Sequence, residues 1–227
     1  MNWLKRFLGS TIGLKVIMAL SGLALFGFVL GHLAGNLQVF LGREAFNAYA
    51  EALQGNQALV WFVRVSLLGI VFAHIGSAVT LTMRSKAARP VGYKSRKWLS
   101  GSYAVRTMRF GGLVLLAFIV YHLLHLTVGT VHPDFTHCVP AGHGKVDCDA
   151  FHNLTVGLRN PAVAGFYIIS QLALGMHLAH GVWSMCRTLG LANPRFDGLS
   201  RKAAWTFGGL VAAGNISIAV ACLAGLV

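Results

Sequence analysis

Charged residues are scarce in this sequence. Of 227 residues only 11% are charged and 56% are hydrophobic, and the mean hydropathy is +0.65. A chain of this composition has too little polar surface to cover a water-soluble domain. Acidic residues are the rarest, with six Asp and Glu against 19 Lys and Arg, and none lies within a long apolar stretch. This excludes a carboxylate-bridged di-iron bundle and an intramembrane proton relay built on Asp or Glu.

Cysteine is also rare, since the chain has four. They form neither a C-x-x-C-H motif for covalent haem nor an iron–sulfur framework, and the sequence has no phosphate-binding glycine loop. Cys138 and Cys148 are separated by nine residues in a polar loop. On an oxidising outer side this spacing predicts a disulfide, with two free thiols as the alternative because spacing does not give geometry. No special role is expected for Cys186 and Cys222.

Long apolar stretches are what the sequence has in abundance. Five of them are long enough to cross a hydrocarbon core of ~30 Å as helices. They cover residues 14–41, 58–83, 110–131, 162–185 and 203–227. The sequence therefore predicts an all-α, polytopic membrane protein, a single transmembrane domain over residues 1–227. Residues 84–107 are predicted as an inner loop and residues 132–160 as an outer loop.

The positions of the cations predict the orientation. With the N-terminus in the cytoplasm and the C-terminus outside, fifteen of the 19 Lys and Arg residues lie inside, as the positive-inside rule requires. The inner cations are Lys5, Arg6, Lys15, Arg84, Lys86, Arg89, Lys94, Arg96, Lys97, Arg106, Arg109, Arg187, Arg195, Arg201 and Lys202; the outer ones are Arg43, Arg64, Lys145 and Arg159. Five acids, Glu44, Glu51, Asp134, Asp147 and Asp149, lie outside.

The pI near 10.3 thus reports topology and does not indicate nucleic-acid binding. The basic inner surface suits anionic membrane lipid or an acidic protein partner.

Histidine is the chemistry-bearing residue within the spans. Six histidines lie there, at least one in each of the first four spans: His32, His74, His122, His125, His177 and His180. His74 and His177 each stand ten residues before an inner cation, ~15 Å from the inner boundary at 1.5 Å per residue. His32 and His122 stand 17 and 13 residues past an inner cation, ~26 and ~20 Å from the same boundary. The depths therefore define two layers with two histidines each.

Two neutral imidazoles at one depth on facing helices suit axial ligation of a non-covalent haem. We therefore predict two haems b, one between His74 and His177 near the cytoplasm and one between His32 and His122 near the outside. Arg84, Arg109 and Arg187 are candidate partners of the inner haem propionates or plain topology anchors. His125 and His180, three residues after two proposed ligands, are rival ligands or hydrogen-bond partners of a propionate, water or quinone. A His-only metal site on the H-x-x-H pairs is a further alternative.

Several short motifs then bring in a family resemblance. These are Gly31-His32-Leu33 with Asn36, Gly42-Arg43-Glu44-Ala45-Phe46-Asn47, Ala73-His74, Arg109 with Tyr121-His122, and His177 with Gly181-Val182-Trp183-Ser184. In their order and placement they resemble the single-chain, five-helix, di-haem cytochrome b subunit of succinate dehydrogenase and fumarate reductase.

The resemblance implies His122 and His177, rather than His125 and His180, as ligands. It also implies the pairing of helix I with III and of II with IV. Its other implications are a flavoprotein subunit and an iron–sulfur subunit on the cytoplasmic face, electron transfer to menaquinone or ubiquinone, and a multi-pass location in the bacterial cytoplasmic membrane. Dimerisation of the complex is left open.

One departure from the family concerns protons. Some menaquinol-oxidising relatives carry a glutamate two residues before the helix IV ligand, where this chain has Gly175, so a proton path of that type is not expected. Glu44 and Glu51 are candidate quinone-side acids, with a solvated loop face as the alternative reading.

Two rival functions remain. One is the b-type anchor of a formate dehydrogenase or hydrogenase, and the other is a His-dependent transporter without haem.

Overall fold

The chain forms a bundle of long helices in a computed structural model, which describes residues 3–89, 91, 103–132, 135, 139–140, 146–147 and 149–227. Within these residues five helical segments are long and apolar enough to cross a membrane. They are Thr11–Leu41, Gln57–Ala87, Tyr103–Thr127, Pro161–Thr188 and Pro194–Ala224. The predicted fold class, an all-α membrane bundle with five spans, is confirmed.

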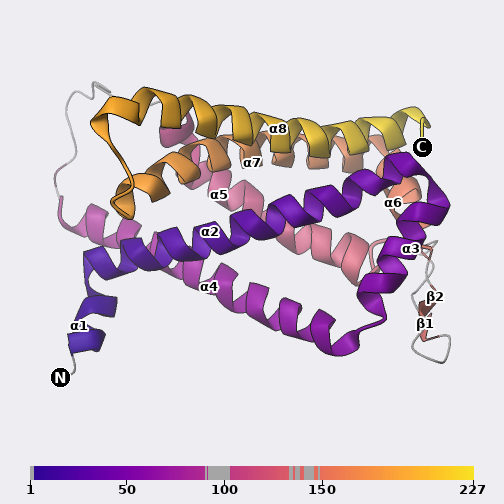
Figure 1. The fold of residues 1–227 in the computed structure, drawn as a ribbon, viewed down its shortest axis with the longest axis horizontal. Helices are drawn as coiled ribbons and strands as arrows, with labels where there is room; N and C mark the ends of the chain where they lie inside the picture. The colour runs from indigo at the N-terminus through magenta and orange to yellow at the C-terminus, as the bar shows by residue number, and fades with distance from the viewer. Residues whose placement is uncertain are drawn as a thin grey trace.

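The long helices lie side by side, with the chain termini at opposite ends of the bundle (Figure 1). In chain order the elements are α1 (Trp3–Gly9), α2 (Thr11–Asn36), the 3₁₀ turn η1 (Leu37–Leu41), α3 (Arg43–Gln54), α4 (Gln57–Ala87), α5 (Tyr103–His122), the π-helical turn η2 (Leu123–Thr127), β1 (Val139–Pro140), β2 (Val146–Asp147), α6 (Ala150–Arg159), α7 (Pro161–Thr188), the 3₁₀ turn η3 (Pro194–Phe196) and α8 (Asp197–Ala224). The antiparallel β1–β2 pair, α3 and α6 gather at the end of the bundle opposite α1.

Polar residues at the starts of the long helices fix where those helices begin. The side chain of Ser10 accepts from the Gly13 N–H at 3.0 Å, and that of Asn56 accepts from the Leu59 N–H at 3.0 Å. Asn160 accepts from the Ala162 N–H at 2.9 Å, directly before α7. Each cap satisfies a backbone donor that has no partner within its helix.

Several helices extend beyond the predicted spans, and the reason is the same for most of them. Helix α5 begins at Tyr103 rather than at residue 110, ahead of Arg109, and α8 begins at Asp197 rather than at residue 203, ahead of Arg201. Long basic side chains reach from a helix to the membrane surface, so cations mark the membrane boundary and not the end of the helix. The predicted loop 84–107 therefore includes helical ends. The predicted loop 132–160 contains α6.

The alternating helix directions bring those inner cations that the structure describes to one end of the bundle, the end that carries α1 (Figure 1). Which end faces the cytoplasm stays a prediction. The predictions for Lys94, Arg96, Lys97, Asp134, Lys145 and the Cys138–Cys148 disulfide lie outside the described residues.

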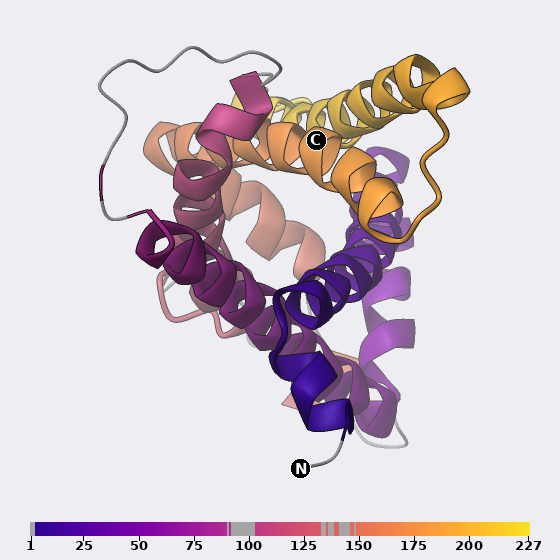
Figure 2. The ribbon, with the colours of Figure 1, turned by 90° about the vertical axis from the view of Figure 1, so that its left-hand side faces the viewer.

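Packing is uneven across the bundle. Helices α7 and α8 cross closely: a Cβ built on Gly208 would lie 2.4 Å from the carbonyl oxygen of Gly175, so only glycine fits there. In the most apolar windows, 44% of residues are buried in α7 and 39% in α8, against 0% in α4 and 6% in α5. Viewed from the α1 end, α2, α4, α5 and α7 surround the middle of the bundle, and α8 lies alongside α7 (Figure 2).

Candidate functional site

Four histidines on four different helices meet as two facing pairs. His32 on α2 and His122 at the end of α5 have ring centroids 5.8 Å apart and ring planes at 87°. His74 on α4 and His177 on α7 have ring centroids 6.2 Å apart and ring planes at 60°. We call His32 and His122 the outer pair, and His74 and His177 the inner pair, after the sides on which the sequence predicts them. These are the same pairs that the depth argument grouped.

In the inner pair, the backbone of α2 holds one ring. His74 Nδ1 lies 3.2 Å from the Met18 carbonyl oxygen and 3.2 Å from Ser21 Oγ. Because a carbonyl oxygen only accepts hydrogen bonds, His74 carries its proton on Nδ1, and Nε2 keeps its lone pair. Gly22 gives the ring room, since a Cβ there would lie 3.3 Å from His74 Cε1.

In the outer pair, side chains rather than backbone hold one ring. His122 Nδ1 lies 3.2 Å from the Tyr167 hydroxyl oxygen, which is 2.8 Å from His125 Nδ1. His122 also stacks on Phe118 at a centroid distance of 5.5 Å. The outer pair therefore lies in an aromatic cluster that α5 and α7 build together.

The second ring of each pair has no hydrogen bond within the described part of the chain. His177 Nδ1 is buried without a partner. His32 stacks on Phe28 at 5.3 Å and makes ring contacts only. Each pair thus combines one anchored imidazole with one that is held by packing alone.

The two rival histidines differ in their surroundings. His125 lies in the π-helical turn η2, closed by a hydrogen bond from the Val128 N–H to the Leu123 carbonyl, and is 0% exposed. His180 packs its ring against Trp183 at 6.2 Å. No sequence signal gave the π turn. Tyr167 was also missed, although it is the only tyrosine in the fourth span.

The candidate propionate partners lie at the α1 end. Arg84 and Arg109 are exposed there. Arg187 lies over the Trp183 ring at 4.8 Å and 3.5 Å from Asp197, to which the Trp183 Nε1–H donates at 3.0 Å. This ion pair joins the end of α7 to the start of α8, so Arg187 is already engaged within the chain.

The two candidate quinone-side acids, Glu44 and Glu51, are both exposed on α3. A further acid, which the sequence did not single out as a site residue, contacts α3. Asp149 pairs with Arg43 and accepts from Asn47 Nδ2 at 3.1 Å, which joins α3 to the start of α6.

The surroundings of Asp149 set its ionisation. Partial burial raises its pKa, but hydrogen bonds from Arg43, Asn47 and the His152 N–H, together with the Arg43 charge, outweigh burial and lower the pKa to about 2. Asp149 is therefore ionised at neutral pH, and its charge ties α3 to α6.

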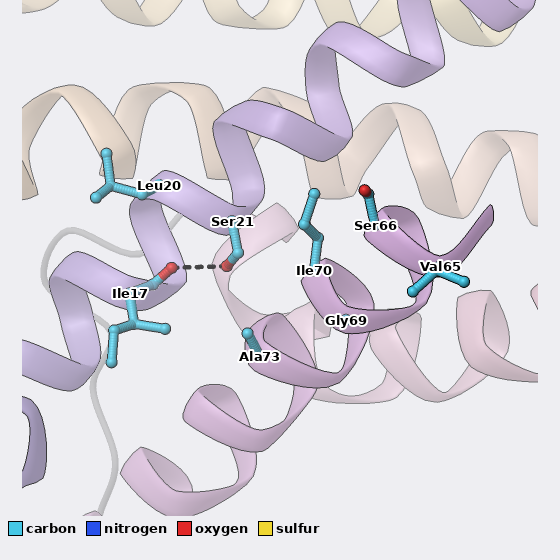
Figure 3. A pocket seen from close by; sticks show the side chains of 8 residues that line it. All are labelled: Ile17, Leu20, Ser21, Val65, Ser66, Gly69, Ile70 and Ala73. Atoms are coloured by element: carbon cyan, nitrogen blue, oxygen red, sulfur yellow. Dashed lines mark hydrogen bonds between the residues drawn. The ribbon is translucent and has the colours of Figure 1, made fainter. Parts of the chain in front are cut away.

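A cavity of about 590 Å³ opens between α2 and α4 (Figure 3). Ser21, which contacts His74, and Ala73, its neighbour in sequence, both line it. The full lining is Ile17, Leu20, Ser21, Val65, Ser66, Gly69, Ile70 and Ala73. This mostly apolar lining suits an apolar group and not an ion.

Haem b is the group that the resemblance implies, and the residues present fit it. An imidazole nitrogen binds a first-row metal at about 2 Å, so two ring centroids on opposite sides of one ion lie roughly 6 Å apart. The separations of 5.8 and 6.2 Å match that requirement. The buried Nδ1 of His177 has no hydrogen-bond partner among the described residues, and within them α4 packs extensively on α2 alone.

The His-only metal site finds no support. No group of three or more His, Cys, Asp or Glu residues suited to a metal ion occurs in the part of the chain that the structure describes. A haem iron needs only two protein ligands.

Five membrane-length helices with two facing histidine pairs between them define a multi-pass membrane protein with the architecture of a membrane-bound cytochrome b. The chain is 28% identical over 177 residues to the succinate dehydrogenase cytochrome b558 subunit of Bacillus subtilis (strain 168), a match that covers 76% of this chain and 77% of the relative. This match confirms the resemblance to the succinate dehydrogenase cytochrome b family that was drawn from the motifs. No family model and no solved structure matches it.

Proposed function

We propose that the chain is the di-haem, quinone-reactive membrane anchor of a succinate:quinone oxidoreductase in the bacterial cytoplasmic membrane. The observation that carries this proposal is the meeting of four histidines from four helices as two facing pairs. The relative from Bacillus subtilis, named as a succinate dehydrogenase cytochrome b558 subunit, supports it. The name favours a succinate dehydrogenase or fumarate reductase anchor over that of a formate dehydrogenase or hydrogenase.

The four histidines act as ligands in this proposal, one haem b to each pair. His74 presents Nε2 because the Met18 carbonyl holds its Nδ1 proton. Haem bound between His32 and His122 and between His74 and His177 would supply a one-electron couple at each level of the bundle. Because different groups hold the two pairs, the two haems are expected to have different potentials.

Cations at the inner end are assigned to the haem propionates and to the docking of partner subunits. Arg84 and Arg109 are the cations we assign to propionates, while Arg187 is occupied by Asp197. The concentration of cations at that end suits docking of an iron–sulfur subunit that carries the flavoprotein subunit, and it also suits anionic lipid.

At the opposite end, the exposed Glu44 and Glu51 are the candidate acids for proton transfer with menaquinone or ubiquinone.

The test is a reduced-minus-oxidised visible spectrum with pyridine haemochrome quantification of the complex purified with its co-purifying subunits. Wild type is expected to bind two haems b per chain. His74→Ala and His122→Ala are each expected to lose a different haem. His180→Ala is the matched control and is expected to keep both, because its ring lies three residues beyond His177 and packs on Trp183.

The outcome against the proposal is also defined. A wild-type complex that binds no haem, expressed with adequate haem supply and its neighbouring subunits, contradicts the cytochrome function and favours the transporter. Co-purification with a formate dehydrogenase or hydrogenase subunit contradicts the succinate assignment alone.

A further inference from the structure

The Tyr167 hydroxyl bridges two histidines in the outer half of the bundle. Its oxygen lies 3.2 Å from His122 Nδ1 and 2.8 Å from His125 Nδ1. Tyr167 is 7% exposed and His125 is 0% exposed, so water does not compete for these bonds. A hydroxyl has one hydrogen, so it donates to one of the two rings and accepts from the other.

The direction of this chain of hydrogen bonds decides which nitrogen of His122 is free. If Tyr167 donates to His122, then His122 carries its proton on Nε2 and has no lone pair left for a metal. If Tyr167 donates to His125, then His122 donates from Nδ1 and keeps a lone pair on Nε2. Only the second direction is compatible with His122 as a ligand.

We propose that Tyr167 and His125 are positioning residues for the outer haem: they hold His122 in the tautomer with a free Nε2 and tune the potential of the haem that His122 ligates. This inference rests on the proposed di-haem function and adds two residues to it. Neither residue touches the haem in this scheme, because both act through His122.

The packing around His125 supports its role as a fixed acceptor of the hydrogen bond from the Tyr167 hydroxyl. A Cβ built on Gly157 of α6 would lie 2.4 Å from His125 Nε2, so the glycine backbone closes that side of the ring. The rings of His132 and Phe135 lie 4.8 and 5.4 Å from it. His125 Nε2 is buried without a hydrogen-bond partner. Among the described residues, the Tyr167 hydroxyl is therefore the only hydrogen-bond partner of this ring.

In the inner pair, the tautomer of His74 does not depend on the direction of a side-chain hydrogen bond. The Met18 carbonyl can only accept, so the proton of His74 is fixed on Nδ1 by the backbone. In the outer pair the selection depends on two replaceable side chains. The difference makes the proposal testable at one haem, with the other as an internal reference.

The expected effect follows from ligand basicity. A hydrogen bond from Nδ1–H to an acceptor makes an imidazole more basic and favours the oxidised iron. In Tyr167→Phe, His122 loses that acceptor, so the midpoint potential of the haem held by His122 is expected to rise. We expect roughly a tenfold change in its reduced-to-oxidised ratio at fixed potential, about 59 mV for a one-electron couple. The other haem should not change.

Tyr121→Phe is the matched control. Tyr121 packs on the His125 ring at 5.4 Å in the same aromatic cluster, but no hydrogen bond to either histidine is present. The variant therefore removes a tyrosine hydroxyl beside His125 without touching the chain of hydrogen bonds. Its two midpoint potentials, measured by optical redox titration of the purified complex, are expected to equal those of wild type.

A second pair of variants tests the proposal even where Tyr167→Phe fails to assemble. His125→Asn keeps an acceptor near the position of Nδ1, whereas His125→Leu removes it. The proposal requires the potential of the His122 haem to rise in His125→Leu and to stay near wild type in His125→Asn. It is overturned if His125→Leu leaves both potentials unchanged, or if the haem lost in His74→Ala is the one that shifts. A wild type without two haems instead overturns the proposed function on which this inference rests.

Discussion

The outer and inner histidine pairs have the same composition but are held by different groups. In the inner pair, His74 is fixed by a main-chain carbonyl of the neighbouring helix, at 3.2 Å. In the outer pair, His122 is fixed by the Tyr167 side chain, which depends in turn on His125. A backbone acceptor is present whatever the side chain at that position, whereas a side-chain acceptor can be exchanged by a single substitution. The inner pair is therefore the robust level, and the outer pair is the adjustable one.

The two levels also differ in what covers them. Helix α6, at the end opposite α1, presents Gly157 to His125. Its N-cap is Asp149, whose ion pair with Arg43 joins α6 to α3. Nothing comparable lies beside His74 in the described part of the chain, where an open cavity separates parts of α2 and α4. Changes in the α3–α6 layer are thus expected to reach the outer pair only.

The largest effect is expected from Gly157→Ala. The new Cβ would lie 2.4 Å from His125 Nε2 and 2.9 Å from Phe135 Cζ, so the His125 ring must move. Overpacking of this kind costs about 1–3 kcal/mol, so the thermal unfolding midpoint of the purified complex should fall. The spectrum of the haem held by His122 should change, and that of the other haem should not.

Gly165→Ala on α7 is the control for this substitution, because no atom lies within 4 Å of its built Cβ. It is expected to keep the wild-type midpoint and both haem spectra. Equal destabilisation by the two alanines would mean that general helix effects, and not the contact with His125, explain the result.

Asp149→Asn is expected to have a smaller effect, and one that depends on pH. The pKa of Asp149 in the folded chain is about 2, below the ordinary value of 3.8. A carboxylate with a lowered pKa contributes stability above its unfolded pKa, and that contribution disappears as the pH falls from about 4 to about 2. Because asparagine can still cap α6, the variant should lose about 0.5–1 kcal/mol at neutral pH, as expected for an exposed ion pair.

The measurement is the unfolding midpoint of wild type and variant at several pH values from 6 to 3. The two curves should converge at the acid end. The double variant Arg43→Ala/Asp149→Asn should be no less stable than Asp149→Asn alone, because both substitutions break the same ion pair. A gap between wild type and Asp149→Asn that is the same at every pH would rule out the charge as its source.

Much of this architecture follows from the sequence, and the reasons are local. A span is a property of one contiguous stretch, so five apolar runs predict five helices. Depth is also local, because a fixed rise per residue converts distance along the chain into distance across the membrane. That conversion was enough to group His32 with His122 and His74 with His177. The helix that contains Arg109 extends beyond its predicted span for the matching reason, since hydropathy detects the membrane boundary and not the helix end.

What the sequence did not predict depends on how helices are rotated against one another. The bond from Tyr167 to His125 joins residues 42 positions apart and requires the π turn after His122, which no periodicity announces. The contact between Arg43 and Asp149 joins residues 106 positions apart across two short helices. Gly175 was read as the site of a missing carboxylate, and the structure gives it a packing role against Gly208 as well.

The smallest effect is expected from Ser21→Ala in the inner pair. Ser21 Oγ lies 3.2 Å from His74 Nδ1, but the Met18 carbonyl lies equally close and remains in the variant. The loss should therefore stay below about 0.5 kcal/mol, and the midpoint potential of the haem held by His74 should not change. Ser77→Ala is the matched control, because Ser77 also donates to backbone carbonyls of its own helix, at 2.8 and 2.9 Å, but does not contact the ring nitrogens. If Ser21→Ala moved the inner potential as far as Tyr167→Phe moves the outer one, the backbone would not be what holds His74, and the contrast between a robust inner pair and an adjustable outer pair would fail.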